Sequence, residues 1–415
     1  MHARTKPGRY ECMTDLAFWE DLYRRTKKPD LHPALTGFNV NLDQILPVTR
    51  ELLDPAGFCK GSLEEVRSRL TSSMQHYTAE EWIMEDRSLY ERLSSCFAGT
   101  GTITLGGQAG IAAAHLARLG APSVTCTAPS MGPEVARIIG ESGVRVFGDR
   151  RSSAADAVHY IFEYAPGLVP PARGAVIRNN RFIISPVKTA DVTLLSDTAL
   201  AALLPELAEG TRAFLSGYQY LKSDKEFSRA ASQVQAIRDA GRDNRVHIEC
   251  VSVTDPRVNA GIVRHILPVA DSAGMNENEL SLLLGHRVEP GPDHLVEGVL
   301  KLAKKTGLTR VHLHTYGVYL LVTHEKRARP DFSRDALLYA AAVTAAAARG
   351  TTTAVSPTGI AALRRITTLL GEEDALGMWS TRDYHIQAVP TLIASDSART
   401  TGLGDILSST AFVAD

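Results

Sequence analysis

A loop near the end of the chain combines residue types that can hold an anion and accept a proton. The sequence TTGLGDILSS covers residues 400–409, between an apolar strand-like run at 389–394 and a short amphipathic run at 406–413. Its two glycines let the backbone bend tightly and present N–H groups at a helix N-terminus, which attracts anions. Asp405 adds a carboxylate at the same tip. The combination suits phosphoryl transfer, although a Gly-x-Gly-Asp turn also occurs as a plain strand-to-helix connection.

A second glycine-rich turn, at residues 106–110, lies between a predicted strand and a predicted helix within residues 99–121. In α/β proteins this unit brings the backbone close to a small ligand. The turn is not a GxGxxG fingerprint, and no GK[ST] follows it. We therefore expect neither a dinucleotide site nor a Walker A ATPase.

Polar side chains alternate along residues 37–45, which we predict to be a strand. Asn39, Asn41 and Asp43 share one face of this strand. Because short polar residues are disfavoured in strands, they either mark an exposed edge or hydrogen-bond a polyhydroxylated ligand.

Carboxylates and amides gather in two places in the second half of the chain. His247 and Glu249 lie on one face of a predicted strand, near the end where ligands bind to open parallel sheets. The sequence NENE at 276–279 follows an apolar strand, and such oxygen ligands suit Mg²⁺. The same residues also fit a helix start, with Asn276 as N-cap and Glu279 in a capping box. The two roles are compatible.

Two apolar segments fall outside the main alternation of strands and helices. HYIFEY at 159–164 and NNRFIISPV at 179–187 flank a bend rich in proline and glycine, so they predict two antiparallel strands of a lid. Arg181 lies beside Asn180 in the second strand, and a planar guanidinium binds phosphate well. Arg178 and Arg181 can also be simply solvated.

The remaining segments predict an α/β fold with a parallel sheet. Strands at 123–129, 144–148, 213–221 and 245–253 alternate with helices in a βαβα rhythm. Residues 265–280 predict an apolar strand that runs into a polar loop, and residues 310–323 predict a strand or a hairpin. The helices are expected at 10–35, 62–95 with a break near 75–78, 197–208, 225–241, 292–306, 333–349 and 357–372. Ser333 is the expected N-cap of its helix.

Length and composition indicate a soluble globular protein. The 415 residues suggest one large domain plus a smaller one, 44% of them are hydrophobic, and no apolar run is long enough to span a membrane. The formal net charge of −1 argues against a nucleic-acid partner. The N-terminal segment lacks the apolar core of a signal peptide. The five cysteines show no CxxC spacing, which favours reduced, mostly buried thiols in a cytoplasmic protein and gives no zinc signal.

In this order the segments resemble those of the ADP-dependent sugar kinases, the glucokinase/6-phosphofructokinase family of the ribokinase-like superfamily. The resemblance runs in family order over residues 37–410. The segments that carry it are Asn41-Leu42-Asp43, the GGQAG turn at 106–110, HYIFEY, Asn180-Arg181-Phe182, FLSGYQ at 214–219, His-x-Glu at 247–249, SAGMNENEL at 272–280, HLHTYGVY at 312–319 and the terminal GLGD.

The resemblance implies a ribokinase-like three-layer α/β/α large domain with a mostly parallel sheet, and a smaller β-rich lid that closes over the sugar. We expect the large, nucleotide-binding domain to comprise residues 1–45, 99–155 and 190–415. The lid would comprise residues 46–98 and 156–189.

The resemblance also implies a role for each candidate residue. Asp405 would be the base, and the backbone N–H groups of Gly402, Leu403, Gly404 and Asp405 would form the anion hole. The expected sugar-binding residues are Asn41, Asp43, Glu81, Gly106, Gly107 and Gln108, with Glu85 as an alternative to Glu81. The expected neighbours of ADP are Asn180, Arg181, Pro390 and Thr401. Glu249, Glu279 and Asn276 would organise Mg²⁺, mostly through water.

The implied reaction transfers the β-phosphoryl group of ADP to a sugar or sugar-phosphate hydroxyl with Mg²⁺, and leaves AMP. Fructose 6-phosphate is slightly favoured over glucose, because the GGQAG and HYIFEY segments look more like the phosphofructokinase branch. Lys188 and Arg178 can supply charge for a phosphate, whereas Glu81 would serve glucose. Ile406 departs from the Thr that often follows the GLGD aspartate in this family.

Three alternatives stay open. The first is a kinase of this family for another sugar or a nucleoside-type substrate, the second a non-catalytic sugar- or nucleotide-binding homologue, and the third an ATP-using ribokinase-type enzyme. No nucleic-acid or membrane partner is expected, and the oligomeric state is open between monomer and dimer.

Overall fold

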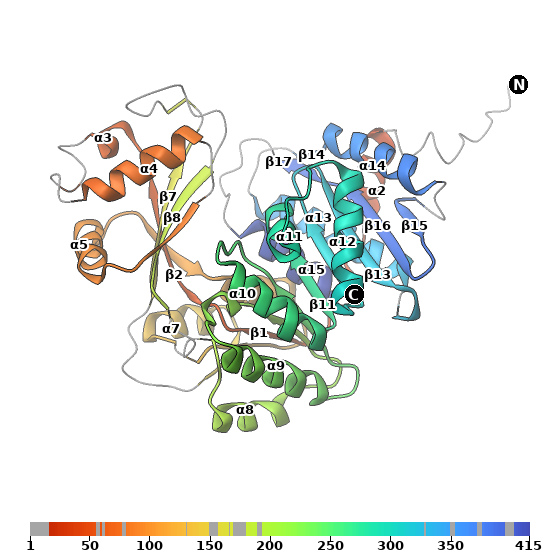
Figure 1. The fold of residues 1–415 in the computed structure, drawn as a ribbon, viewed down its shortest axis with the longest axis horizontal. Helices are drawn as coiled ribbons and strands as arrows, with labels where there is room; N and C mark the ends of the chain where they lie inside the picture. Colours follow the sequence, from red (N-terminus) through yellow and green to blue (C-terminus); the bar gives the residue numbers. More distant parts are fainter. Residues whose placement is uncertain are drawn as a thin grey trace, which may run out of the picture.

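The structure, a computed structural model, has two lobes: a large α/β domain and a smaller lid (Figure 1). It describes residues 16–54, 59, 63–76, 80–129, 131–148, 157–165, 167–168, 180–188, 193–327, 329–348, 353–371, 376–394 and 402–415. No helix within these ranges is long and apolar enough to cross a bilayer.

A ten-stranded sheet forms the centre of the large domain. Its strands, in spatial order, are β15 (Met378–Ser380), β16 (Tyr384–Pro390), β13 (Val318–His324), β12 (Arg310–His314), β11 (Ser272–Met275), β10 (Arg245–Glu249), β9 (Arg212–Leu215), β1 (Ala34–Gly37), β5 (Val124–Thr127) and β6 (Arg145–Phe147). The strands from β12 to β6 are parallel, and the first three are antiparallel to their neighbours. Strands β1, β9 and β11 are buried at every residue, as parallel strands covered on both faces should be.

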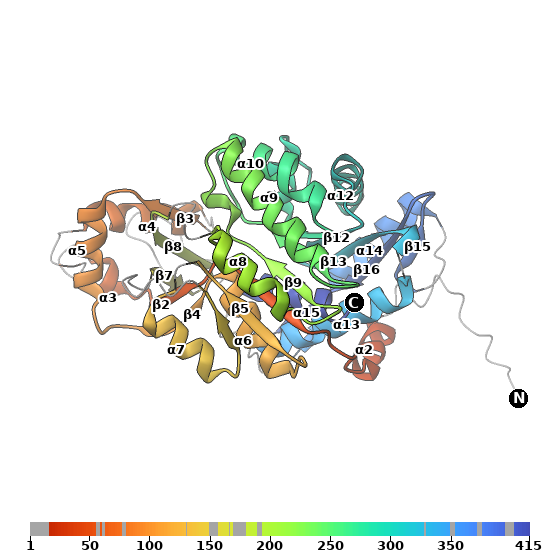
Figure 2. The same ribbon diagram turned by 90° about the horizontal axis from the view of Figure 1, so that it is seen from below.

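Helices cover both faces of this sheet, which gives three layers (Figure 2). One face carries α2 (Leu16–Arg25), α6 (Gln108–Leu119), α7 (Pro133–Glu141), α13 (Pro330–Ala347) and α15 (Leu403–Val413). The other carries α9 (Asp224–Asp239), α10 (Pro256–Gly261), α11 (Glu277–Leu284), α12 (Pro292–Thr306) and α14 (Pro357–Leu370). The smaller elements are α8 (Asp197–Leu203) and a ribbon of β14 (Thr353–Val355) and β17 (Leu392–Ala394). The predicted α/β class and mostly parallel sheet are confirmed.

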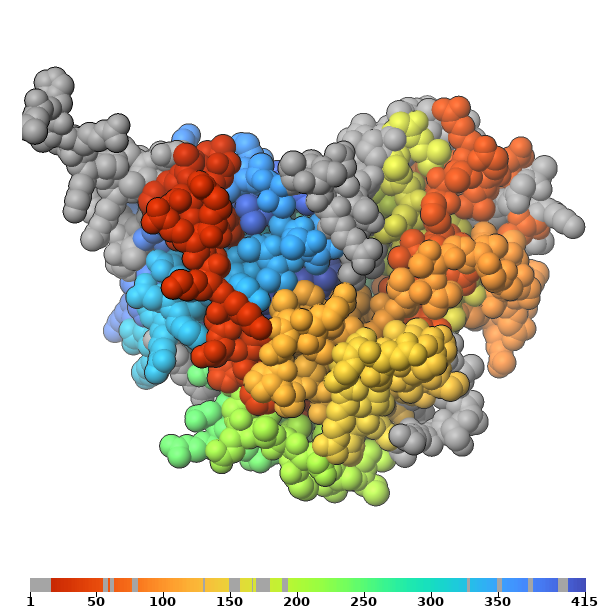
Figure 3. All heavy atoms as spheres, turned by 180° about the vertical axis from the view of Figure 1, so that it is seen from behind, coloured from red at the N-terminus to blue at the C-terminus, as the bar shows by residue number. Residues whose placement is uncertain are grey.

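The lid is a five-stranded sheet with helices packed on it. Its strands, in spatial order, are β3 (Glu80–Met84), β8 (Asn180–Pro186), β7 (Val158–Tyr164), β2 (Asn41–Pro47) and β4 (Thr102–Gly106). Its helices are α3 (Arg50–Leu53), α4 (Glu64–His76) and α5 (Arg87–Phe97). Leu46, Leu93, Phe162 and Phe182 belong to its own buried core. Figure 3 shows the orange lid helices and the yellow-green β7 and β8 on one side of the molecule, away from the blue C-terminal elements.

The strand predicted at 37–45 is in fact two strands in two sheets. Strand β1 ends at Gly37 in the large sheet, and β2 begins at Asn41 in the lid. Strand β4 also pairs with β2, so both of these strands lie in the lid sheet rather than in the large domain to which we had assigned them. An alternating pattern predicts a strand, but it does not identify the partner strand.

Three local predictions are wrong because tertiary contacts decide the outcome. Helix α13 begins at Pro330 with Arg329 as N-cap, and the Ser333 hydroxyl inside it donates to Asp415 Oδ1 at 2.9 Å. The strand predicted from residue 265 begins later, because residues 262–269 form short helical turns and only Ser272–Met275 (β11) are extended. Cys59 and Cys96 form a disulfide across 37 residues, so not all the cysteines are reduced thiols, whereas Cys126 and Cys250 are free and buried.

Candidate active site

Three neighbouring parallel strands end at one edge of the large sheet and bring polar residues together there. Strand β10 ends at Glu249, β11 leads into Asn276, and β12 ends at His314. The N-terminus of α15, with Asp405 in its first turn, lies at this same edge. The carboxyl edge of a parallel sheet is the usual place for a ligand in open α/β folds.

The turn at the start of α15 has the backbone geometry that the sequence predicts. Gly402 is the N-cap residue with φ of 75° in the left-handed region, and no side chain of the described residues caps the helix. The first helical hydrogen bond joins Ile406 N to the Gly402 carbonyl at 3.1 Å. The N–H groups of residues 403–405 therefore lie outside the bonding of the helix itself. The Ile406 side chain is buried in the core, with 1% exposed.

Asp405 is a buried carboxyl group among several charges. Burial is the main cause that raises the pKa of Asp405 to about 7, and the negative charge of Glu249 adds to it. His314, Arg181 and a hydrogen bond with Gln108 act in the opposite direction on this pKa. A carboxylate that titrates near neutrality suits general-base catalysis.

Two histidines hold Glu249 from both sides. His247 Nε2 lies 2.9 Å from Oε2 of Glu249, and His314 Nε2 lies 3.2 Å from Oε1. Burial alone would raise the pKa of Glu249, but the two hydrogen bonds outweigh burial and hold this pKa at about 2. Burial also opposes the charged form of His314, yet Glu249 raises the pKa of His314 to about 9. At neutral pH the site therefore holds an ionised pair, Glu249 and His314.

The NENE segment forms the capping box that the sequence predicts. Asn276 Oδ1 accepts hydrogen bonds from the N–H groups of Asn278 and Glu279, and Glu279 Oε2 accepts one from the N–H of Asn276 at 2.8 Å. Burial raises the pKa of Glu279 to about 7, against the opposing charge of His314.

The same carboxylates were also predicted to organise Mg²⁺. Among the described residues, no group of three His, Cys, Asp or Glu side chains is arranged to hold a metal ion. Glu249 nevertheless lies near enough to Glu279 to raise its pKa further, and a cation beside the two would favour the ionised form of Glu279. The donor set therefore fits a hydrated Mg²⁺ held through waters rather than in a protein cage.

The lid contributes a second buried carboxyl group. Asn41 Nδ2 donates to Asp43 Oδ1 at 2.7 Å, and both residues are buried at the start of β2. Burial raises the pKa of Asp43 to about 7, and Asp405 is among the charges that contribute to this shift. The two carboxyl groups therefore lie near one another across the boundary between lid and large domain. A Cβ on Gly106, which is paired with Asn41, would overlap Asp43 Oδ1, so only glycine fits this close approach.

Further residues from the lid and α6 face the same region. Arg181 on β8 acts on the pKa of Asp405, and its N–H donates to the Asn180 side chain at 2.9 Å. Gln108 begins α6 after Gly107, and its Nε2 donates to the Cys250 carbonyl at 3.1 Å.

Glu81 and Lys188 form an adjacent charged group. Glu81 accepts a hydrogen bond from the Ser185 hydroxyl. Lys188 is buried, donates to Asn39 Oδ1 at 3.2 Å and lies 5.2 Å from the ring centre of Tyr220. Burial lowers the pKa of Lys188 to about 8, while Glu81 and Asp43 oppose that shift.

The remaining predicted residues are less informative. Glu85 is exposed. Pro390 is buried at the end of β16, where its carbonyl accepts a hydrogen bond from the Tyr23 hydroxyl at 2.5 Å. Thr401 and Arg178 lie outside the described residues.

His314 is the main residue that the motif analysis did not assign. It shares one face of β12 with His312, and β12 ends at the same sheet edge as the His-x-Glu strand. That spacing at the end of an apolar strand was a usable signal. Ser272 and Arg310, which contact each other beneath α15, gave no comparable signal.

The arrangement can do one kind of chemistry well. A base with a pKa near neutrality adjoins backbone N–H donors and two cations, Arg181 and His314. Such a site can deprotonate a hydroxyl group while it stabilises the charge of a transferring phosphoryl group.

A family model described as the ADP-specific phosphofructokinase/glucokinase conserved region matches residues 33–414 of this chain. The chain is 27% identical to an ADP-dependent glucose/glucosamine kinase of Pyrococcus furiosus, over 96% of this chain and 98% of the relative. It is 24% identical to an ADP-specific phosphofructokinase of Methanosarcina acetivorans, over 95% and 90%. A solved ADP-dependent kinase in complex with fructose-6-phosphate and ADPβS has a similar fold, with a TM-score of 0.77, 23% identity and coverage of 99% and 98%.

Proposed function

Because the chain belongs to the ADP-specific phosphofructokinase/glucokinase family, we propose that it transfers the β-phosphoryl group of ADP to a hydroxyl of a hexose or hexose phosphate. Named members of this family are phosphotransferases that use ADP and an alcohol acceptor. The bond between the α- and β-phosphates of ADP breaks, a new phosphate ester forms, and AMP leaves.

The observation that carries the proposal is the surroundings of Asp405. This carboxyl group lies in the first turn of α15, within electrostatic reach of Glu249 and His314 of the large domain and of Asp43 of the lid. A structural carboxylate would gain from a fixed ion pair, whereas the pKa of Asp405 is about 7. Such a pKa is characteristic of groups that exchange protons in catalysis.

The lid residues would hold the acceptor sugar. Asn41 and Asp43 offer amide and carboxyl groups to hydroxyls, and the missing side chain at Gly106 lets Asp43 lie directly against the β4 backbone. Asp405 would then accept the proton of the attacking hydroxyl. Gly107 and Gln108 would complete the sugar contacts beside that base.

The transferring phosphoryl group would lie at the N-terminus of α15. The N–H groups of residues 403–405 point out of the helix, and the positive end of the helix dipole favours an anion there. His314 and Arg181 add positive charge near Asp405. Asn180, Pro390 and Thr401 are proposed as further neighbours of the nucleotide.

Mg²⁺ would supply positive charge that neutralises the phosphates of ADP during transfer. Glu249, Glu279 and Asn276 would hold it through waters. The two carboxylates lie close enough to influence each other's protonation, as partners of one hydrated cation would.

Two charged side chains would select the acceptor. Lys188 suits a sugar phosphate, and Glu81, oriented by Ser185, suits a hydroxyl or amino group of an unphosphorylated sugar. Both kinds of acceptor appear in the names of the relatives. Fructose 6-phosphate and glucose are therefore the first acceptors to test.

One experiment tests the proposal directly. Purified protein with Mg²⁺ is given ADP or ATP against glucose, glucosamine and fructose 6-phosphate, and AMP and sugar phosphate are quantified. We expect turnover with ADP and one of these acceptors. Tight binding of ADP and a sugar by calorimetry, without product in any combination, would instead support a non-catalytic homologue, and a preference for ATP would overturn the donor assignment.

A further inference from the structure

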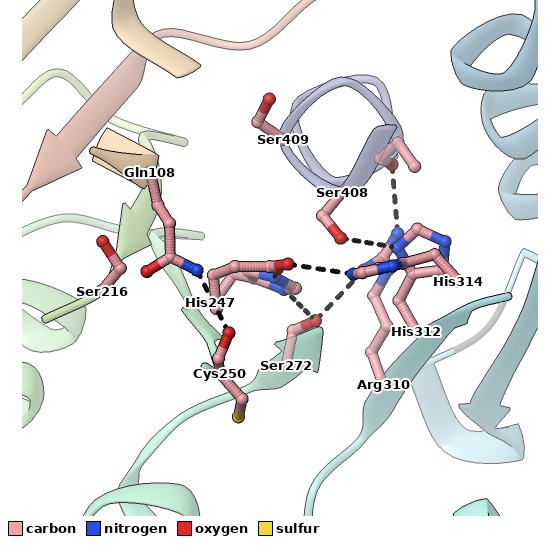
Figure 4. A network of polar contacts seen from close by, with 12 residues as sticks. Gln108, Ser216, His247, Cys250, Ser272, Arg310, His312, His314, Ser408 and Ser409 are labelled. Carbon is pink, nitrogen blue, oxygen red and sulfur yellow. Dashed lines mark hydrogen bonds and ion pairs between the residues drawn. The ribbon is translucent and has the colours of Figure 1, made fainter. Parts of the chain in front are cut away.

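A continuous chain of hydrogen-bonded polar groups runs from Asp415, beyond the end of α15, to the sheet edge. Figure 4 shows its part from Arg310 through Ser272 and His247 to His314. Arg310 Nε lies 2.9 Å from Asp415 Oδ2, and Arg310 Nη1 lies 3.1 Å from Ser272 Oγ. Ser272 Oγ lies 2.7 Å from His247 Nδ1. From His247 the chain continues through Glu249 to His314.

The direction of each hydrogen bond in this chain follows from its first member. A guanidinium can only donate, so Ser272 Oγ accepts from Arg310 and keeps its own hydrogen for His247 Nδ1. Because the carboxylate of Glu249 can only accept, His247 Nε2 carries the ring hydrogen, and Nδ1 is left to accept from the Ser272 hydroxyl. The ring hydrogen is donated to Glu249 Oε2. Arg310 and Ser272 thus fix both the orientation and the tautomer that hold one side of Glu249.

The space around the chain leaves little room for movement. A Cβ on Gly274 would overlap Glu249 Oε2 and would lie 2.7 Å from His247 Nε2, so even one methyl group does not fit beside this hydrogen bond. At the other end, a Cβ on Gly404 would lie 2.9 Å from His314 Cε1. The His314 ring therefore packs directly against the anion-binding turn.

We propose that Ser272 and Arg310 are positioning residues that act through His247 and Glu249 to hold the His314 ring against Gly404. This inference rests on the proposed kinase function, because it is the phosphoryl group at that turn that His314 would meet. Ser272 and Arg310 are remote from the reacting atoms and act only through the chain. A carboxylate held from one side only can rotate, and a histidine bound to it then loses its fixed place.

Two neighbouring residues, His312 and Ser408, are hydrogen-bonded to each other but do not belong to this hydrogen-bond path. His312 lies on the same strand as His314, and its Nδ1 lies 3.1 Å from Ser408 Oγ. His312 forms no hydrogen bond with Glu249 among the contacts of the described residues. In the part of the chain that the structure describes, the path through Ser272 and His247 reaches the carboxylate that holds His314.

The kinetic test uses Ser272→Ala with Ser73→Ala as a matched control. Ser73 is an equally buried serine in the lid, and its hydroxyl lies 3.2 Å from the Tyr164 hydroxyl, outside the chain. We expect Ser272→Ala to lower kcat by about 10- to 100-fold, because the hydrogen bond that orients His247 is lost. KM for ADP and for the sugar should stay almost unchanged. Ser73→Ala should retain the kcat of the wild type, and both variants should unfold at similar temperatures. A wild-type kcat in Ser272→Ala would overturn the proposal.

A spectroscopic readout separates this inference from the kinase function. In protein with ¹⁵N-labelled histidine, the Nδ1 resonance of His247 should move in Ser272→Ala, and the ring resonances of His314 should move with it. An unmoved His314 signal would overturn the proposal even if kcat falls. If the wild type shows no turnover with any acceptor, the proposed function fails, and these resonances still decide whether the chain positions His314.

Arg310→Lys provides a second variant in case Ser272→Ala does not fold. Lysine keeps the charge but does not reproduce three separate bonds, to Ser272, Asp415 and the Ala411 carbonyl. We expect the same fall in kcat and the same shift of the His314 signals. The double variant Ser272→Ala/Arg310→Lys should be no slower than the slower of the two single variants, because both substitutions interrupt the same hydrogen-bond path. Additive losses would contradict a shared path.

Discussion

Asp405 is the proposed base, and its surroundings act on its pKa in two opposite directions. Burial and Glu249 favour its protonated form, while His314 and Arg181 favour the carboxylate. Glu249 itself is held ionised by two histidines, so it adds a fixed negative charge rather than a second titrating group in the same range. The balance leaves Asp405 able to gain and lose a proton near neutral pH.

Replacing Asp405 by Asn should lower kcat by roughly 100- to 10,000-fold, because the amide cannot accept the proton of the hydroxyl. ADP binding measured by calorimetry should stay almost unchanged, since the backbone donors of the turn remain. Asp335→Asn on the exposed face of α13 is the matched control and should behave as the wild type. Normal turnover in the Asp405 variant would end its assignment as the base.

The pH dependence of the reaction should report the same group. Since the pKa of Asp405 is raised to about 7, kcat/KM for the acceptor should rise with pH through about 7 and level off above it. Initial rates at saturating ADP across this range would measure the profile. A profile that stays flat from about pH 5 to about pH 9 would show that Asp405 does not limit the reaction.

At the scale of elements, α15 connects the anion-binding turn to the core. Its residues from Ile406 to Val413 are buried, and Asp415 beyond its end is bound to Arg310 and Ser333. The catalytic tip is thus one end of a helix that is anchored at the other end. In the lid, the pairing of β2 with β4 brings Asn41 opposite Gly106, and Asp43 of the same strand β2 lies near enough to Asp405 for their charges to interact.

Gly106→Ala should disturb the close contact between Gly106 and the Asp43 side chain. The added methyl group would overlap Asp43 Oδ1, so kcat/KM for the acceptor should fall by about 10- to 100-fold, whereas ADP binding is affected little. Gly140→Ala is the control, because its Cβ meets nothing within 4 Å and it lies inside α7. That control should retain activity and raise the free energy of unfolding by about 0.5–1 kcal/mol. Equal kinetics in the two variants would contradict the close approach.

For the whole molecule, the structure joins two lobes with separate cores around one group of buried charges. Asp43 comes from the lid and Asp405 from the large domain, and the pKa of each is raised to about 7 mainly by burial. Two carboxyl groups that resist ionisation oppose the folded state at neutral pH. The raised pKa values that suit catalysis therefore lower the stability of the folded protein at the boundary between the lid and the large domain.

The stability of the wild type should respond to pH accordingly. The pKa of Asp405 in the folded protein, about 7, lies above its ordinary value of 3.8. Its contribution to the free energy of unfolding is therefore fully present below about pH 4 and is lost as pH rises through about 7. Asp405→Asn removes that loss, so its melting temperature should exceed that of the wild type at pH 8 and approach it at pH 5. The gain at pH 8 should be on the order of 1 to 3 kcal/mol. Thermal unfolding of both proteins at the two pH values measures this, and an equal difference at both would refute it.

Four local units were predictable from neighbouring residues: the Gly-Gly turn between β4 and α6, the capping box at Asn276, the antiparallel pair β7 and β8, and the turn before Asp405. These depend on residues within a few positions of one another, so propensity, periodicity and capping are enough to predict them. The family resemblance supplied their order and the reaction they imply.

Only the tertiary structure decided which strand pairs with which, and therefore what surrounds each charge. Strand β2 joins the lid rather than the large sheet, Cys59 pairs with Cys96, and Ser333 contacts Asp415 instead of capping its helix. The hydrogen-bond path from Arg310 through Ser272 to His314 links residues of three strands, β12, β11 and β10, which lie far apart in the sequence. Their pKa values and positions arise from burial and from contacts between distant segments, which a linear pattern does not encode.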